Sequence, residues 1–173
     1  MMAQLIKDDR LQADAWQTLE LAAGQSAETV ELPSGDTIFP LAVWQARRAE
    51  ITGRGARAGL LLQPGERVED IAADLGHFAV IAVNFPKFAD GRGYSTASLL
   101  RQRYRYHGEL RAVGDVLHDQ LFFMRRVGFN SYALKDGKDA ARALAEGFKG
   151  FSDSYQASAS QPQPHFRRRP QTR

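Results

Sequence analysis

The chain has 173 residues, 43% of them hydrophobic and 25% charged, which is the composition of an ordinary globular protein long enough to bury a core. It has no cysteine, so disulfide bonds, thiolate nucleophiles and cysteine-ligated zinc or iron–sulfur centres are excluded. The net charge of +3 is local, because residues 157–173 hold four arginines and no acidic residue.

Composition along the chain predicts three parts. Residues 1–25 are weakly patterned, residues 26–156 are expected to form a single α/β domain, and residues 157–173 form a Ser-, Gln- and Pro-rich basic tail that is expected to be disordered. The N-terminal residues are charged where a signal peptide is apolar, and no window approaches the ~18 apolar residues of a membrane span. We therefore expect a cytoplasmic protein with no membrane partner.

The first predicted elements are a short strand at residues 29–32, a turn at Pro33 and Gly35, and a helix over residues 41–51. The run "AGLLLQPGE" (58–66) reads as a buried strand that Pro64 and Gly65 stop. A helix over "RVEDIAADLGH" follows, with Gly76 as its stop. "FAVIAVNF" (78–85) is a continuous apolar run, which is typical of a strand covered on both faces.

The second half of the chain repeats this rhythm. A helix with Ala97, Leu100 and Tyr104 on one face precedes a strand at "ELRAV" (109–113). A helix over residues 114–128 is predicted to present Val116, Leu117, Leu121, Phe123, Met124 and Val127 to the core. A fifth strand, "FNSYAL" (129–134), and a helix at 138–151 complete the pattern.

This alternation predicts an α/β fold of βα units with a mostly parallel sheet of about five strands. A complete eight-stranded barrel usually needs more than ~200 residues, so we expect an open layer fold or a partial barrel.

The turn after residue 85, "NFPKFADGRGYS", is predicted to be an anion site. Gly91 and Gly93 allow the backbone to approach a ligand closely, and the guanidinium of Arg92 can hold two oxygens of a sulfite, sulfate, phosphate or carboxylate. The alternative is a plain tight turn in which Asp90 or Ser95 caps the helix and Arg92 points to solvent. Candidate anion-binding residues are Gly91, Arg92, Gly93, Tyr94, Ser95, Arg111 and Gly114.

A second turn, Gly114 and Asp115, follows the next predicted strand. Because parallel strands place their carboxyl ends at one edge of the sheet, Asp115 is expected to face Asp90 or Arg92. Asp90 and Asp115 are the candidate catalytic residues, as an acid, a base or an orienting carboxylate. The alternative is that Asp115 only caps the following helix. Arg111 lies inside an apolar strand, so it must be paired, for example with Glu109, or line a site.

Other kinds of site have weaker signals. The "GRG" of the first turn imitates a dinucleotide fingerprint, but Thr96 stands at the third glycine. His118 and Asp119 lack the spacing of a metal site, so no metal is expected and the cofactor stays unknown. Arginines interleave with aromatic residues, a pattern that can bind nucleic acid but more often marks a solvated face. These residues are Arg101, Arg103, Tyr104, Arg105, Tyr106, His107 and Arg111.

The order of motifs "FADGRGYS", "LLRQRY", "GELRAVGDVLHDQL", "RRVGF" and "FSDSYQ" resembles an uncharacterised bacterial family labelled as an oxidoreductase of sulfite reduction. Its members are typically encoded beside the haemoprotein of assimilatory sulfite reductase. The resemblance covers about residues 30–156 and carries the family motifs onto both turns and onto Gln120. One departure is Asn130, because the family commonly has an acid after "GF".

The resemblance implies an auxiliary protein of assimilatory sulfite reduction that binds a small oxyanion or the reductase. Two alternatives stay open. One is an oxidoreductase with a non-covalent cofactor, and the other is a non-enzymatic adaptor that docks on sulfite reductase through the face around Phe122 or through the tail.

Overall fold

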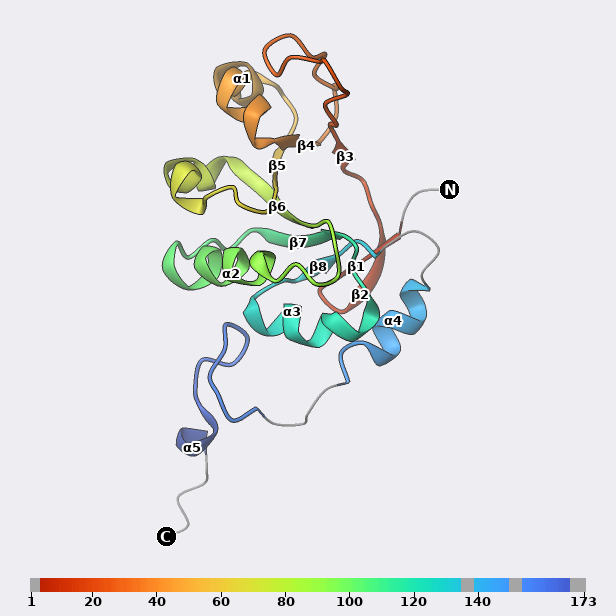
Figure 1. Ribbon diagram of the computed structural model, residues 1–173, viewed down its shortest axis with the longest axis vertical. Coiled ribbons are helices and arrows are strands. Elements are labelled where there is room, and N and C mark those ends of the chain that lie inside the picture. Colours follow the sequence, from red (N-terminus) through yellow and green to blue (C-terminus); the bar gives the residue numbers. More distant parts are fainter. Residues whose placement is uncertain (1–3, 135–138, 150–153, 169–173) are drawn as a thin grey trace.

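The protein is described by a computed structural model that covers residues 4–134, 139–149 and 154–168. Eight strands form one curled, open sheet with the form of a half-barrel (Figure 1). In spatial order they are β2 (Arg10–Ala13), β1 (Gln4–Lys7), β8 (Ser131–Tyr132), β7 (Glu109–Gly114), β6 (Phe78–Phe85), β5 (Ala58–Leu62), β4 (Thr37–Pro40) and β3 (Gln17–Thr18).

Strands β3 to β8 run parallel to one another, and β1 joins them antiparallel to β8. The helices are α1 (Leu41–Gly53), η1 (Val68–His77), α2 (Arg92–Ser98), η2 (Leu99–Arg103), η3 (His118–Gln120), α3 (Leu121–Val127), α4 (Ala140–Glu146) and α5 (His165–Arg168). The predicted α/β class, the mostly parallel sheet and the partial barrel are confirmed, but the sheet has eight strands instead of five.

Strand β6 shows why this sheet forms. Residues that point to either face of the strand are buried, and only Ala79 and Asn84 are half-buried, so the run "FAVIAVNF" is apolar except for Asn84. Ile81, Val83 and Phe85 belong to the main core, which includes buried residues of the helices. Val80 and Ala82 form a smaller cluster on the opposite face, against which Trp16 of the N-terminal segment packs.

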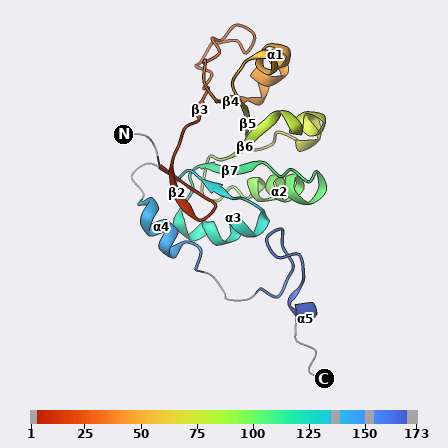
Figure 2. The same ribbon diagram turned by 180° about the vertical axis from the view of Figure 1, so that it is seen from behind.

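The N-terminal residues add strands for which the sequence showed only weak patterning. The hairpin β1–β2 pairs Lys7 with Arg10, and Asp8 and Asp9 make its turn at φ 47° and 60°. Figure 2 shows this hairpin at one edge of the sheet and the long segment through β3 that reaches the other edge. Strand β2 is exposed along its whole length, so it lacks the alternating burial that makes a strand recognisable in a sequence.

Two predicted elements are wrong. Residues 29–32 are not a strand: only Val30 is buried there, and the side chain of Arg47 satisfies its carbonyl in place of a neighbouring strand. The helix predicted at "RVEDIAADLGH" is present over Val68–His77 and is of the 3₁₀ type. The helix expected over 114–128 begins only at His118, because Gly114 extends β7 and the Asp115 N–H donates to Phe85 O at 2.7 Å.

This later start also changes which side chains face the core. Phe123, predicted to be buried, is 53% exposed, whereas Leu121 and Met124 are fully buried. Phe122, on which the docking alternative rests, is half-buried and packs edge-on against Phe123 at 5.4 Å. Phe88, whose carbonyl is bonded by Gln120 just before α3, is also exposed, at 50%.

The predicted basic tail is described as far as Arg168, and residues 169–173 lie outside the described residues. Its first part packs as a loop against α3, where Ala159 N donates to Arg126 O at 3.0 Å and Arg126 Nη2 donates to Gln156 O at 3.3 Å. The loop then leads to the short helix α5 (Figure 1). The tail therefore places residues 157–162 beside the amino ends of β7 and β8.

Candidate functional site

The Arg92 side chain of the predicted anion turn is paired with Asp90. Arg92 Nη2 donates to Asp90 Oδ2 at 2.7 Å and Nε donates to Oδ1 at 3.0 Å, so the carboxylate fills the guanidinium fork. This pairing lowers the pKa of Asp90 and raises the pKa of Arg92. The Arg92 side chain is 64% exposed, so an anion at Arg92 has to compete with Asp90 and with water.

The two glycines of this turn have different roles. A Cβ at Gly91 would meet nothing within 4 Å, whereas a Cβ at Gly93 would lie 2.5 Å from the ring of Phe85. Position 93 therefore requires glycine, because α2 packs closely on β6 there. Tyr94 also packs edge-on against Phe85, its burial raises the pKa of its hydroxyl, and Ser95 is exposed.

The turn at Gly114 and Asp115 contacts the anion turn through the backbone of Phe88. Asp115 Oδ2 accepts a hydrogen bond from Phe88 N at 3.2 Å, and Gln120 Nε2 donates to Phe88 O at 3.3 Å. The expected proximity of the two turns is thus present, through a bond from Asp115 to the backbone of the loop at Phe88. Gly114 has φ 94° and lies against Asn84 and the Phe85 carbonyl, so this position requires glycine.

Arg111 lies on the other face of the sheet, in a buried network of charges. It contacts Glu109 Oε1 at 2.8 Å and Asp14 Oδ2 at 2.8 Å, and Lys7 Nζ lies 2.7 Å from Glu109 Oε2. The expected pairing with Glu109 is confirmed. Burial raises the pKa of Glu109, but Arg111 and hydrogen bonds to its carboxylate outweigh this effect and lower it overall. Ser131 lies opposite Arg111 on β8 and is fully buried.

Beside this network a cavity of about 870 Å³ lies at the carboxyl ends of the parallel strands, where α/β folds commonly bind ligands. Asn84, Arg111 and Gly114 line it together with apolar residues such as Leu61 and Val113. The charge of Arg111 is already balanced by Glu109 and Asp14, and Glu20 adds a further acid to the lining. This cavity therefore gives no preference for an anion.

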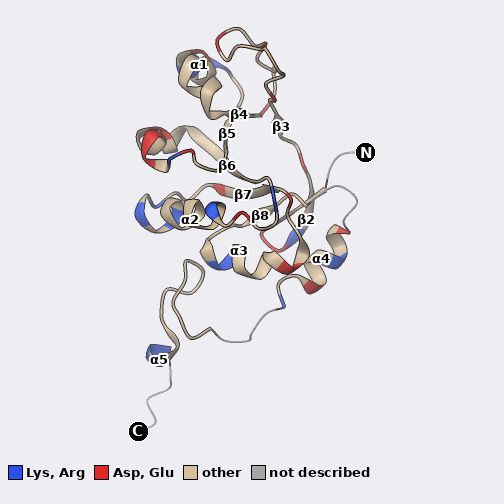
Figure 3. Ribbon diagram, in the orientation of Figure 1, with Lys and Arg blue, Asp and Glu red and all other residues tan. Residues whose placement is uncertain are grey.

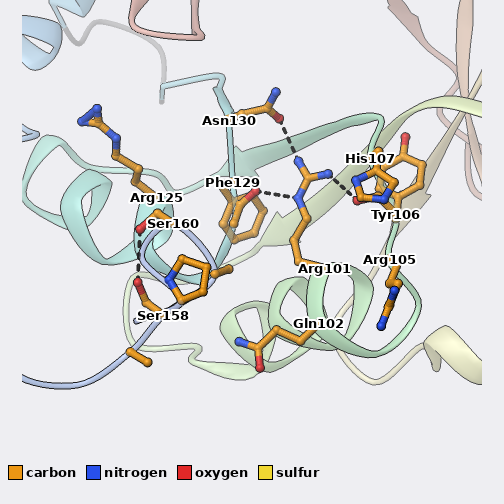
Figure 4. Close-up of a pocket in the computed structure, with 14 residues that line it drawn as sticks. Arg101, Gln102, Arg105, Tyr106, His107, Arg125, Phe129, Asn130, Ser158 and Ser160 are labelled. Atoms are coloured by element: carbon orange, nitrogen blue, oxygen red, sulfur yellow. Dashed lines mark hydrogen bonds between the residues drawn. The ribbon is translucent and has the colours of Figure 1, made fainter. Parts of the chain in front are cut away.

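A second cavity, of about 820 Å³, does favour an anion, and we call it the basic pocket. It lies at the amino ends of β7 and β8, between the segment 101–107, the start of β8 and the tail loop 157–162 (Figure 4). Arg101, Arg105, His107 and Arg125 line it, and no acidic residue is among the described residues of its lining. Figure 3 shows the basic residues that follow α2 and those of α3 near the tail.

Arg101 is the fixed cation of the basic pocket. Its side chain donates to Gly128 O at 2.9 Å, Tyr106 O at 2.6 Å, Gly108 O at 2.9 Å and Asn130 Oδ1 at 3.2 Å, all of which are uncharged. Burial lowers the pKa of Arg101, although an arginine stays protonated at any physiological pH. A half-buried charge whose direct partners are all neutral creates a positive potential in the cavity.

Gly128 makes this placement possible. Its φ of 114° ends α3, and a Cβ there would lie 2.3 Å from Cγ of Arg101. The other cations of the pocket differ in their pairing. Arg125 Nη2 donates to Asp9 Oδ2 at 2.8 Å, whereas Arg105 makes no hydrogen bond or ion pair with any described residue. Arg105 is also exposed and adopts φ 53°.

Asn130, the departure from the family pattern, holds Arg101 without neutralising it. Its Oδ1 accepts from Arg101 Nη2 and from Leu110 N at 2.8 Å, and its Nδ2 donates to Asp8 Oδ1 at 3.0 Å. An aspartate at this position would offer Arg101 a carboxylate and would face Asp8 across the same short distance. The amide therefore keeps the positive charge of the pocket available.

The arginine–aromatic alternation at 101–107 is the signal in the sequence that points to the basic pocket. Four of its members, Arg101, Arg105, Tyr106 and His107, line the cavity, and Tyr106 is buried. Arg103 instead lies over the ring of Tyr104 and is exposed. The sequence could not show that Arg125, Asn130 and the tail loop complete the cavity, because these residues come from three other segments.

The described residues show neither a metal-binding cluster nor a membrane-spanning helix. Within these ranges no three His, Asp or Glu side chains gather closely enough to hold a metal ion. No helix in the described part of the chain has the length and apolar character that crossing a membrane requires.

Comparison with known proteins gives a family. The chain matches no curated protein. The family model described as "Bacterial protein of unknown function (DUF934)" matches residues 59–166, more than half of the chain, and this range runs from β5 to α5 and includes the whole lining of the basic pocket. The resemblance to an uncharacterised bacterial family is thereby confirmed: the chain belongs to this family of bacterial proteins of unknown function.

Proposed function

We propose that this chain is an accessory protein of assimilatory sulfite reduction that binds a small oxyanion in the basic pocket. The motif string that resembles the sulfite-reduction family supports the pathway. The single observation that supports the ligand is Arg101, a half-buried cation that donates only to neutral oxygens in a cavity without an acidic lining residue among those described. We therefore place the anion site in the basic pocket at the amino ends of β7 and β8, and not at Arg92, whose guanidinium is bound by Asp90.

The pocket offers an oxyanion both charge and donors. Arg105 has no partner among the described residues, and Arg125 is 40% exposed and pairs with Asp9. The hydroxyls of Ser158 and Ser160 lie 3.2 Å apart on the tail loop. Hydrogen bonds from ionised donors to an anion are shorter and stronger than those between neutral groups. Because Arg101 is held in place by four hydrogen bonds, little side-chain entropy is lost when an anion enters its field.

Titration calorimetry with sulfite tests the site. We expect measurable binding that weakens as salt is added, because exposed charges such as Arg105 are screened. The variant Asn130→Asp is expected to bind about tenfold more weakly, since a carboxylate then neutralises Arg101. In relatives with an acid at this position, oxyanion binding is expected to be correspondingly weaker.

The matched control is Asn84→Asp, which makes the same chemical change at the carboxyl ends of the strands. Equal weakening in both variants would show that net charge alone governs binding, which contradicts the role of Arg101. An absence of heat with sulfite, sulfate and phosphate at millimolar concentration would remove the ligand part of the proposal.

Growth of a deletion strain on sulfate, sulfite or sulfide as sole sulfur source tests the pathway. We expect failure on sulfate and sulfite and rescue by sulfide, because a protein of the sulfite step is bypassed when the product is supplied. Complementation with the unaltered gene is the control. Normal growth on all three sources would contradict a role in sulfite reduction, whatever the calorimetry shows.

A further inference from the structure

The basic pocket is much larger than an inorganic oxyanion. Its volume is about 820 Å³, and cavities between about 300 and 1,000 Å³ typically enclose ligands the size of a cofactor or a drug. A sulfite or phosphate ion bound at one wall leaves most of this space to water. The size of the cavity therefore points to an oxyanion that is attached to a larger organic body.

The lining residues divide the pocket into two ends. Figure 4 shows Arg125, Ser158 and Ser160 on one side and Arg105 and His107 on the other, with the bonded guanidinium of Arg101 between them. The first end has two hydroxyls and Arg125, which is 40% exposed and pairs with Asp9 through Nη2. These groups can donate to the oxygens of a phosphate or sulfate group, which competes with Asp9 for the guanidinium. The second end has two planar side chains, both exposed, on which a ring can stack.

The conformation of Arg105 supports this division. Its φ of 53° is uncommon for a residue with a side chain, and such conformations persist where the surrounding structure holds them. The neighbouring bonds explain what holds it: Tyr106 N donates to Leu100 O at 2.9 Å, and Tyr106 O accepts from Arg101. The chain thus fixes the backbone of an arginine whose guanidinium has no partner among the described residues.

We infer that the basic pocket binds a nucleotide-sized ligand, in which a phosphate or sulfate monoester lies at Arg125 and the two serines while a planar ring stacks on Arg105 and His107. The inference rests on the proposed function, because it assigns the carrier of the oxyanion that enters the same cavity. It requires no covalent step. Arg101, between the two ends, supplies positive potential to both.

Calorimetry with adenosine monophosphate, ribose 5-phosphate and inorganic phosphate tests the inference. We expect adenosine monophosphate to bind about tenfold more tightly than ribose 5-phosphate, since stacking of one base on a planar side chain contributes that much or more. The variant Arg105→Ala is expected to remove most of this ratio. The control Arg103→Ala removes the same charge from a residue outside the lining and should leave the ratio unchanged.

The outcomes separate the inference from the function on which it rests. Equal affinity for adenosine monophosphate, ribose 5-phosphate and phosphate would overturn the nucleotide-sized ligand and leave oxyanion binding intact. A ratio that Arg105→Ala does not change would overturn the assignment of the ring to this end of the pocket. No binding of any of the three would overturn both proposals.

Discussion

Replacing Arg111 with alanine is expected to lower the free energy of unfolding by about 3–5 kcal/mol, because it leaves buried carboxylates without their cation. Arg111 and Glu109 are 3% and 6% exposed, so water cannot take the place of the guanidinium. Asp14 would lose its ion pair as well, and with it one of the contacts between the N-terminal segment and β7. Urea denaturation followed by the fluorescence of Trp16 and Trp44 measures the change.

Arg92→Ala is the matched control, since it also removes an arginine from an aspartate but at a site that is 64% exposed. Its denaturation midpoint should equal that of the unaltered protein within error. If Arg111→Ala proved no less stable than Arg92→Ala, the buried network would not contribute to stability.

The same network predicts how the free energy of unfolding changes as the pH falls. The pKa of Glu109 is lowered in the folded state, so its contribution to stability is present above the ordinary carboxyl pKa of 4.5 and is lost as the pH falls through the folded value. Without Arg111, burial acts on Glu109 with only Lys7 left to oppose it as a cation. The difference in the free energy of unfolding between the unaltered protein and Arg111→Ala should therefore shrink below about pH 4.

Gly114→Ala is expected to cost about 3 kcal/mol, the second of the two largest effects. The left-handed φ of 94° is unfavourable for alanine by about 1–2 kcal/mol, and the new Cβ would lie 2.5 Å from the carbonyl oxygen of Phe85. A clash with backbone is not relieved by a side-chain rotation. Relief requires β6 and β7 to move apart, which disturbs the bond from Asp115 N to Phe85 O.

Gly91→Ala is the control for this substitution. Gly91 has φ −81° and open space around its Cα, so alanine should be tolerated or should stabilise slightly by restricting the unfolded chain. Comparable losses of stability at both positions would contradict the structural reading of Gly114. The comparison also tests whether the space around Gly91 is open, as the structure has it.

Parts of the fold could be predicted because their burial leaves a recognisable run of residues in the sequence. Strand β6 and strand β7 are recognisable from "FAVIAVNF" and "ELRAV", since both faces of the sheet are covered there. The hairpin β1–β2 was missed because β2 is exposed and the pair is stabilised by partners far along the chain. The register between Gly114 and Phe85 depends on tertiary contact, so the start of the following helix was placed too early.

The candidate site could be predicted only in part, for a similar reason. Topology correctly places the two turns side by side, because consecutive parallel strands end at one edge of the sheet. The pairing of Arg92 with Asp90 and of Arg111 with Asp14 decides which cations keep a free charge, and pairing distances do not follow from sequence spacing. Arg101 and Arg105 were noticed, but their pocket depends on the tail.

The antiparallel contact between β1 and β8 has a consequence for biosynthesis. Asp8 and Asn130, which are hydrogen-bonded, are 122 positions apart along the chain, so the hairpin β1–β2 has no place in the sheet until β8, the last strand, emerges from the ribosome. Contacts of such high sequence separation slow folding, because a long loop must close before they form. Leu5 and Ile6 are buried in the folded protein, so until the sheet is complete they are apolar surface of the kind that promotes aggregation.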